Sequence, residues 1–175
     1  MITRIPWTER RFDFSFPSRL SRELISRVEG APARARASVA GLDRGALTRR
    51  MGEGWSIQEN IAHLADTDRD LFIPRLDQFE AGASELVAAD MTNKATWAAD
   101  HNERTIEDVL GQFEAQRRAI VARLDAHDEA FFERSALHPR LGTPMRVADM
   151  LLFKAEHDDY HLARVRELSR AWEAA

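Results

Sequence analysis

The sequence predicts an all-α protein, a four-helix bundle preceded by an extended N-terminal arm. Three long segments carry apolar residues on one face at helical spacing, and each of them begins at a capping signal. An alternating apolar pattern, typical of an extended segment, occurs only near the N-terminus. With 31% charged and 44% apolar residues, the 175 residues have the balance of a globular chain, and we expect a single domain spanning residues 1–175.

The N-terminal arm covers residues 1–16. Phe12, Phe14 and Phe16 alternate with Asp13 and Ser15, which gives an extended segment one apolar side. We expect this arm to lie over the body of the protein or over a partner subunit.

The first helical region is less regular than the others. A weak apolar stripe from about Pro17 to Val28 reaches Gly30, and Pro32 is suited to begin a second piece that extends to Ala40. The sequence leaves open whether this is one kinked helix or two.

The second helix begins at a capping box. The Ser56 side chain accepts a hydrogen bond from a backbone amide, and Glu59 reaches back to the amide of Ser56. We expect this helix to run to about Phe79 and to end at Gly82.

A long connection and two further helices complete the bundle. The connection from Gly82 to Arg104 is long enough to cross the whole bundle, so the second and third helices need not be antiparallel. The third helix is predicted from Thr105, with an acid in its first turn, to about His127. Thr143 is predicted to cap the last helix, with Pro144 as its first residue, and the apolar face continues to about Trp172. No strand is predicted outside the arm.

Composition restricts the possible functions. Twenty-five basic and twenty-nine acidic side chains give a formal charge of −4, and no run of Lys and Arg would follow a phosphate backbone, so nucleic acid is not an expected partner. There is no cysteine, which excludes disulfides and thiolate ligands. The N-terminus has no apolar signal region and no stretch is long enough to span a membrane, so we expect a cytoplasmic protein without a membrane partner.

Polar residues interrupt the apolar face of the last helix. Lys154, Asp158 and His161 lie near its centre and His157 lies at its margin. Burying ionisable groups is costly unless they are paired or bind an ion. A pair between Lys154 and Asp158 is one explanation, and metal ligation by the two histidines is another. In the second helix, His63 faces a polar edge.

Two motifs together resemble those of the DinB-like (DinB/YfiT) superfamily of metalloenzymes. The motifs are Trp55-Ser56-x-x-Glu59-x-x-x-His63-Leu64 and Glu156-His157-Asp158-x-Tyr160-His161-Leu162, and the likeness extends from about Gly30 to Arg170. The resemblance implies a four-helix bundle with an up-down-down-up order and a long crossover between helices 2 and 3. It also implies that His63, His157 and His161 bind one divalent metal ion, with Zn, Ni and Fe all compatible.

The resemblance further implies a metal-dependent small-molecule enzyme. Characterised relatives include transferases and isomerases that use low-molecular-weight thiols, so we expect a thiol-dependent S-transferase or isomerase, with thiol or water activated at the three-histidine site. Arg164 is a candidate partner for a carboxylate of the thiol, and a homodimer is expected. The alternatives are a non-catalytic metal-binding stress or sensor protein and an interaction module without metal. No catalytic residue is identified.

Histidine chemistry predicts a pH dependence. Free histidine has a pKa of about 6.5, so acidification to about pH 5 is expected to release the ion. His127 and His138 flank the connection before the last helix and are expected to be solvated bystanders.

Overall fold

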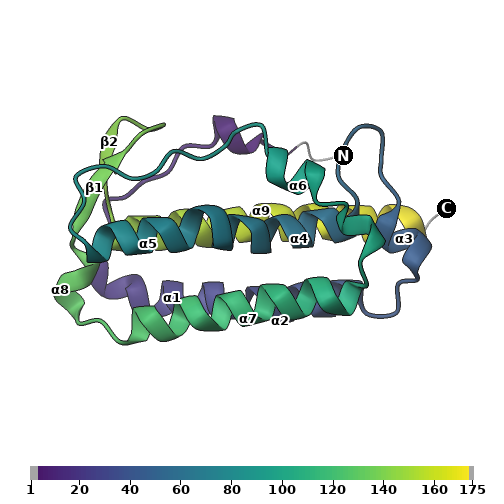
Figure 1. Cartoon of the computed structure of the whole chain (residues 1–175), viewed down its shortest axis with the longest axis horizontal. Coiled ribbons are helices and arrows are strands. Elements are labelled where there is room, and N and C mark those ends of the chain that lie inside the picture. Colours follow the sequence, from purple (N-terminus) through teal and green to yellow (C-terminus); the bar gives the residue numbers. More distant parts are fainter. Residues whose placement is uncertain (1–3, 174–175) are drawn as a thin grey trace.

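The computed structural model describes residues 4–173 and contains the predicted bundle of helices (Figure 1). The α-helices are α1 (Ser21–Glu29), α2 (Ala31–Val39), α3 (Arg44–Thr48), α4 (Ile57–Thr67), α5 (Ile73–Glu80), α6 (Lys94–Ala98), α7 (Ile106–Asp125), α8 (Glu129–Phe132) and α9 (Val147–Glu173). The strands are β1 (Ser135–His138) and β2 (Thr143–Arg146), and single turns are η1 (Trp7–Glu9), η2 (Ser18–Leu20) and η4 (His101–Glu103).

The first two bundle helices are each built from consecutive pieces. Between α1 and α2 only Gly30 intervenes, in right-handed helical conformation, so this region is nearly continuous. The π-helical segment η3 (Asp68–Phe72) lies between α4 and α5 and joins them into one continuous helical region. Ser56 and Glu59 form the predicted capping box, and Gly82 follows the end of α5 with a φ of 71°.

The bundle has an up-down-down-up order. Gln58 near the start of α4 bonds to the carbonyl of Arg104 before α7, and Arg123 near the end of α7 bonds to Glu80 at the end of α5. These two helices are therefore parallel, which requires the long crossover. Figure 1 shows the crossover returning along the bundle through α6 to the start of α7.

The last part of the chain differs from the prediction. Thr143 and Pro144 lie in β2, which pairs antiparallel with β1, so Thr143 does not cap α9 and the statement that no strand occurs outside the arm is wrong. Helix α9 begins at Val147, where the Asp149 carboxylate accepts from the amide of Arg146. Leu137 in β1 also pairs with the crossover, so β2 is the outer strand, where proline is tolerated.

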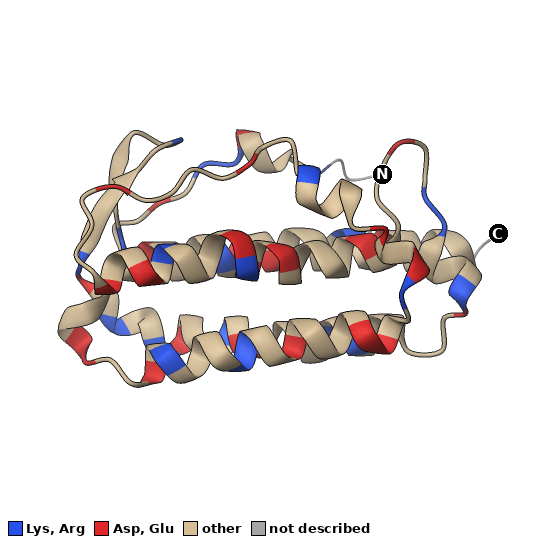
Figure 2. Cartoon of the chain, in the orientation of Figure 1, with Lys and Arg blue, Asp and Glu red and all other residues tan. Residues whose placement is uncertain are grey.

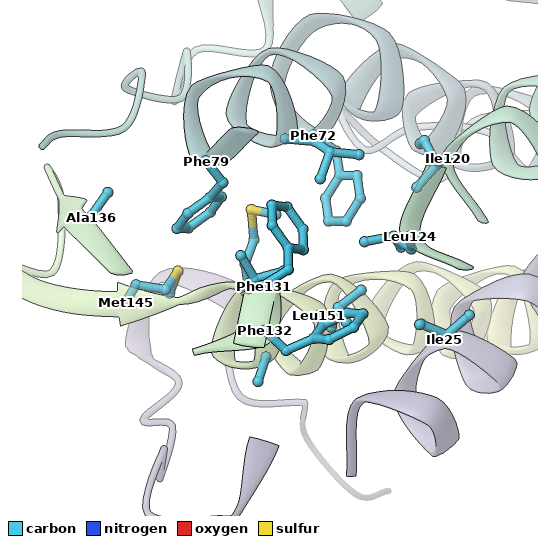
Figure 3. Close-up of a cluster of buried hydrophobic side chains, with 14 of the residues drawn as sticks. Ile25, Phe72, Phe79, Ile120, Leu124, Phe131, Phe132, Ala136, Met145 and Leu151 are labelled. Carbon is cyan, nitrogen blue, oxygen red and sulfur yellow. The ribbon is translucent and has the colours of Figure 1, made fainter. Parts of the chain in front are cut away.

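The apolar core fills both ends of the bundle. One cluster lies at the end that holds α8 and the β1–β2 hairpin, where Phe131 and Phe132 pack among residues from α1, η3, α5, α7 and α9 (Figure 3). A second cluster joins α2, α4, α7 and the end of α9. Lys and Arg side chains are interspersed with Asp and Glu along the helices (Figure 2). Among the described residues, no helix is both long and apolar enough to cross a membrane.

Candidate metal centre

Three histidines converge where α4 and α9 pack together. His63 projects from α4, and His157 and His161 project from α9 one turn apart. Their ring centroids lie 5.3 Å (His63–His157), 4.7 Å (His63–His161) and 4.7 Å (His157–His161) apart, and one nitrogen of each lies within 4.8 Å of the others. Nitrogen ligands about 2.1 Å from one tetrahedral ion are about 3.4 Å apart, so small side-chain rotations suffice for binding.

The tautomer of His161 is fixed by α4. Its Nδ1 lies 3.0 Å from Asn60 Oδ1, while Asn60 Nδ2 donates to the carbonyl of Ser56 at 2.7 Å. Because an amide oxygen only accepts, Nδ1 of His161 carries the hydrogen and Nε2 keeps its lone pair.

His63 is oriented by a buried hydrogen-bonded chain. Its Nδ1 lies 3.0 Å from Thr96 Oγ1, and Thr96 donates its only hydroxyl hydrogen to Asp66 Oδ2 at 2.9 Å. Thr96 therefore accepts from His63 Nδ1, which leaves Nε2 of His63 available to an ion. His101 Nε2 lies 2.8 Å from the same Asp66 oxygen. Burial opposes ionisation of Asp66, but the hydrogen bonds from His101 and Thr96 outweigh it and its pKa is lowered.

The three rings are held in the neutral form that metal ligation requires. Burial, with a smaller effect of the Lys154 cation, lowers the pKa of His63 to about 3. Enclosure likewise lowers the pKa values of His157 and His161 well below 6.5. The donor set of three neutral imidazoles therefore fits a borderline metal ion such as Zn, Ni or Fe.

The histidines form part of the wall of a cavity of about 820 Å³. Trp55 lies 4.5 Å from the ring of His63, and Trp7 lies 5.0 Å from the ring of His157. The N-terminal arm thus contributes to the site, because η1 places Trp7 over α9. An open cavity beside three candidate ligands is typical of catalytic rather than structural metal sites.

A comparison with protein families matches residues 27–165 to the DinB superfamily. The chain belongs to this superfamily. A comparison with curated proteins found no match.

Three solved structures share the fold of this chain. YfiT from Bacillus subtilis, described as a probable metal-dependent hydrolase with an unusual four-helix bundle topology, matches with a TM-score of 0.80, 20% identity and 94% coverage of each chain. A mycothiol-dependent maleylpyruvate isomerase matches with a TM-score of 0.65 and 12% identity, covering 85% of this chain and 60% of the isomerase. A Streptococcus pneumoniae protein matches with a TM-score of 0.66, 11% identity and coverage of 94% and 93%.

Behind the histidines of this DinB-superfamily chain lies a buried network of four charges. Lys154 Nζ lies 2.8 Å from Asp158 and 2.9 Å from Asp68, and the Arg117 guanidinium bonds to both carboxylates. The predicted Lys154–Asp158 pair is confirmed. Burial opposes ionisation of Asp158, but Arg117 and Lys154 outweigh it and lower its pKa. The sequence did not predict Asp68 and Arg117 as members of this network, because they come from η3 and α7.

The remaining histidines differ in their surroundings. His138 is only 2% exposed, so the expectation that it is solvated is wrong; strand pairing in the hairpin draws it inward. His127 is 27% exposed and lies 3.0 Å from Glu80, outside the cavity. The sequence also did not predict the roles of Thr96 and His101, which lie on the crossover, or of Asp66, which lies in α4. The polarity of these three side chains was the only signal that could have pointed to them.

The crossover should therefore affect metal binding. Replacing Thr96 with valine keeps the side-chain shape but removes the acceptor of His63 Nδ1, and we expect metal affinity to fall about 10- to 100-fold. Competition with a chromophoric chelator measures this. Thr92→Val, an exposed change on the same crossover, is the matched control. Equal affinities for Thr96→Val and wild type would contradict the role assigned to Thr96.

The lowered pKa values predict how the metal-free fold responds to acid. The unfolded histidines have a pKa of about 6.5 and the folded ones lie lower, so the unfolded chain takes up more protons and stability falls as pH drops from about 6.5 towards 3. Each ring contributes up to about 1.4 kcal/mol per pH unit.

Urea midpoints of metal-free protein at about pH 7.5, 6 and 5 measure this dependence. In the variant in which His63, His157 and His161 are all glutamine, the urea midpoint should fall less steeply with decreasing pH than in wild type. His127→Gln should show the wild-type dependence of the midpoint on pH. Identical slopes for wild type and the triple variant would exclude this explanation.

Proposed function

We propose that the chain binds one divalent metal ion through Nε2 of His63, His157 and His161 and acts as a thiol-dependent S-transferase or isomerase on small molecules. The observation that carries the proposal is the arrangement of three neutral imidazoles on the wall of a cavity, two of them with Nδ1 already engaged. Such a site leaves Nε2 for the ion and space for a substrate beside it.

When bound, an ion with an open position would lower the pKa of a thiol or water there. In the S-transfer, the thiol sulfur forms a bond to an electrophilic carbon, the leaving group departs with the bonding electron pair, and the thiol proton passes to solvent. Thr96 and Asn60 hold the ligand rings in place, and Trp7 and Trp55 restrict water. The mycothiol-dependent isomerase supports a thiol cosubstrate, and the description of YfiT supports hydrolysis as the related reaction.

A conjugation screen tests this function. Protein loaded with Zn, Ni or Fe(II) is incubated with glutathione, mycothiol or bacillithiol and with 1-chloro-2,4-dinitrobenzene as the electrophile. We expect turnover that requires the ion and disappears in His161→Ala. Stoichiometric metal without turnover in any combination would reject the enzyme in favour of a non-catalytic metal-binding protein. A metal content below about a tenth of stoichiometry that loading does not restore would reject both the metalloenzyme and the non-catalytic metal-binding protein.

The homodimer is part of the same proposal. Trp7 and Phe12 of the arm pack against Phe153 of their own chain, at centroid distances of 4.9 Å each. Light scattering of the full chain and of a chain lacking residues 1–16 tests the oligomeric state and whether the arm contributes to it.

A further inference from the structure

A second polar region of the cavity lies away from the three histidines and offers hydrogen-bond donors. Arg75 from α5, His138 from β1 and Arg140 from the β1–β2 turn all line the cavity. His138 lies 5.7 Å from the ring of Phe153, and the Arg140 guanidinium lies 5.6 Å from the same ring. Figure 1 shows the hairpin and the crossover on the same side of the α5–α9 pair.

Arg75 is a buried cation without an acid. Its side chain is 3% exposed, and Nε and Nη2 both donate to the carbonyl of Val87, at 3.1 and 2.9 Å. Within residues 4–173, it forms no ion pair and Nη1 has no hydrogen-bond partner. Burial and the neighbouring Arg140 lower the pKa of Arg75 to about 10, so it stays charged at neutral pH. An uncompensated buried cation is costly, which points to an anion that comes from outside the chain.

His138 adds a donor to the same region. Its Nδ1 accepts from the amide of Leu141 at 3.2 Å. Burial, followed by the charges of Arg75 and Arg140, lowers the pKa of His138 to about 4, so the ring is neutral and its hydrogen is on Nε2. In the described part of the chain this buried Nε2 has no hydrogen-bond partner. A buried donor without an acceptor is rare and calls for a ligand or water.

The other charges on the cavity wall are already satisfied. Lys154 belongs to the buried network, and Arg164 bonds to Glu167 at 3.1 Å. Asp70 pairs with Arg69, and Asp90 accepts from the amides of Thr92 and Lys94. Among residues 4–173, the charges on the cavity wall without an opposite partner are therefore those of Arg75 and Arg140. Arg164, the candidate carboxylate partner named from the sequence, is paired with Glu167.

We propose that Arg75, Arg140 and His138 form a subsite for a carboxylate of the small-molecule ligand. Phe153, against which this subsite is built, precedes His157 by one helical turn, a rise of about 6 Å. Trp7 bridges the gap, with its ring 4.9 Å from Phe153 and 5.0 Å from His157. The ligand class is thus a short molecule with a carboxylate at one end, an apolar spacer over Phe153 and Trp7, and a reactive end at the histidines. Assignment of the occupant as a substrate rests on the proposed function, but the anion subsite does not.

Binding of hexanoate and hexanol to the full chain, with and without added zinc, tests the subsite. Titration calorimetry and tryptophan fluorescence, with Trp7 and Trp55 in the cavity wall, report binding. We expect wild type to prefer hexanoate over hexanol with or without zinc, and Arg75→Met and Arg140→Met to weaken hexanoate binding about 10-fold or more, leaving hexanol binding unchanged. Arg164→Met, a paired cation on the same wall, should change hexanoate binding less than about 3-fold.

Several results would overturn the subsite. One is equal affinity for hexanoate and hexanol, and another is an effect of Arg164→Met on hexanoate binding as large as that of Arg140→Met. The third is hexanoate binding that requires zinc and is unchanged in Arg75→Met and Arg140→Met, which would place the carboxylate on the metal. Arg140 is exposed, so its variant remains informative if Arg75→Met fails to fold. Hexanoate binding that depends on the arginines, together with no turnover in the conjugation screen, would reject the proposed enzymatic function and retain the anion subsite.

The same variants identify which reactant carries the carboxylate. In metal-loaded protein, Arg140→Met should raise KM for a carboxylate-bearing thiol but not for a neutral thiol if the group belongs to the thiol. It should raise KM for a carboxylate-bearing electrophile alone if the group belongs to the electrophile. If Arg140→Met leaves KM unchanged for both the carboxylate-bearing thiol and the carboxylate-bearing electrophile, the subsite does not bind a carboxylate of either substrate.

Discussion

Replacing His161 with alanine is expected to abolish stoichiometric metal binding, with affinity reduced by more than about 100-fold. Loss of an orienting hydrogen bond behind a ligand already costs about 10- to 100-fold in metal affinity, and His161→Ala removes one of the three proposed protein donors. His161 is buried and its Nδ1 is fixed by Asn60. Among the described residues the cluster contains no fourth His, Cys, Asp or Glu that could take its place. Metal content after dialysis and chelator competition measure the effect.

Two histidine variants serve as controls for this loss. His127→Ala removes an imidazole outside the cavity, and His138→Ala removes one that lines the cavity but is not part of the three-histidine cluster. Both should retain wild-type metal stoichiometry. Equal loss of metal from His161→Ala and His138→Ala would mean that the ion is held elsewhere in the cavity.

Replacing Arg117 with methionine is expected to lower the free energy of unfolding more than any other single substitution proposed above. Arg117 is 1% exposed, and its side chain donates to Asp68, Asp158 and the carbonyl of Val28. Its removal leaves two buried carboxylates with Lys154 as their only cationic partner in the network. Breaking a buried ion pair by removing one partner costs about 3–5 kcal/mol. At 2–4 °C per kcal/mol for a chain of this size, the melting temperature should fall by roughly 6–20 °C.

The adjacent Arg118 provides the control. It is exposed and pairs with Glu114 on the helix surface, so Arg118→Met should change stability by less than about 0.5 kcal/mol. Thermal and urea unfolding of both variants measure the difference. Similar unfolding midpoints for Arg117→Met and Arg118→Met would show that the buried network does not stabilise the fold.

Local signals predicted much of the bundle. The Ser56–Glu59 capping box and the Thr105 cap are interactions between residues three apart, so the sequence contains them completely. The Lys154–Asp158 pair is likewise local, because residues four apart share one helix face.

Errors arose where partners are distant in sequence. Leu137 of β1 pairs with Glu85 in the crossover, and this contact, with the hairpin, converts Thr143 and Pro144 from an expected helix start into a strand. Burial of His138 follows from that hairpin.

The candidate site shows the same division. The spacing of His157 and His161 is visible in the sequence, and the family resemblance added His63. The groups that orient and surround these rings come from distant segments: Thr96 and His101 from the crossover, and Trp7 from the arm. No periodicity links such residues before the chain folds, so the sequence alone did not reveal them.

Anomalous X-ray diffraction from crystals of metal-loaded protein, recorded above and below the absorption edge of the metal, shows whether the three histidines bind one ion. We expect one strong anomalous peak about 2.1 Å from Nε2 of each of His63, His157 and His161, with the Nδ1 contacts of His63 to Thr96 and of His161 to Asn60 retained. A map without a peak among these three rings, or with its peak at other side chains, would contradict it.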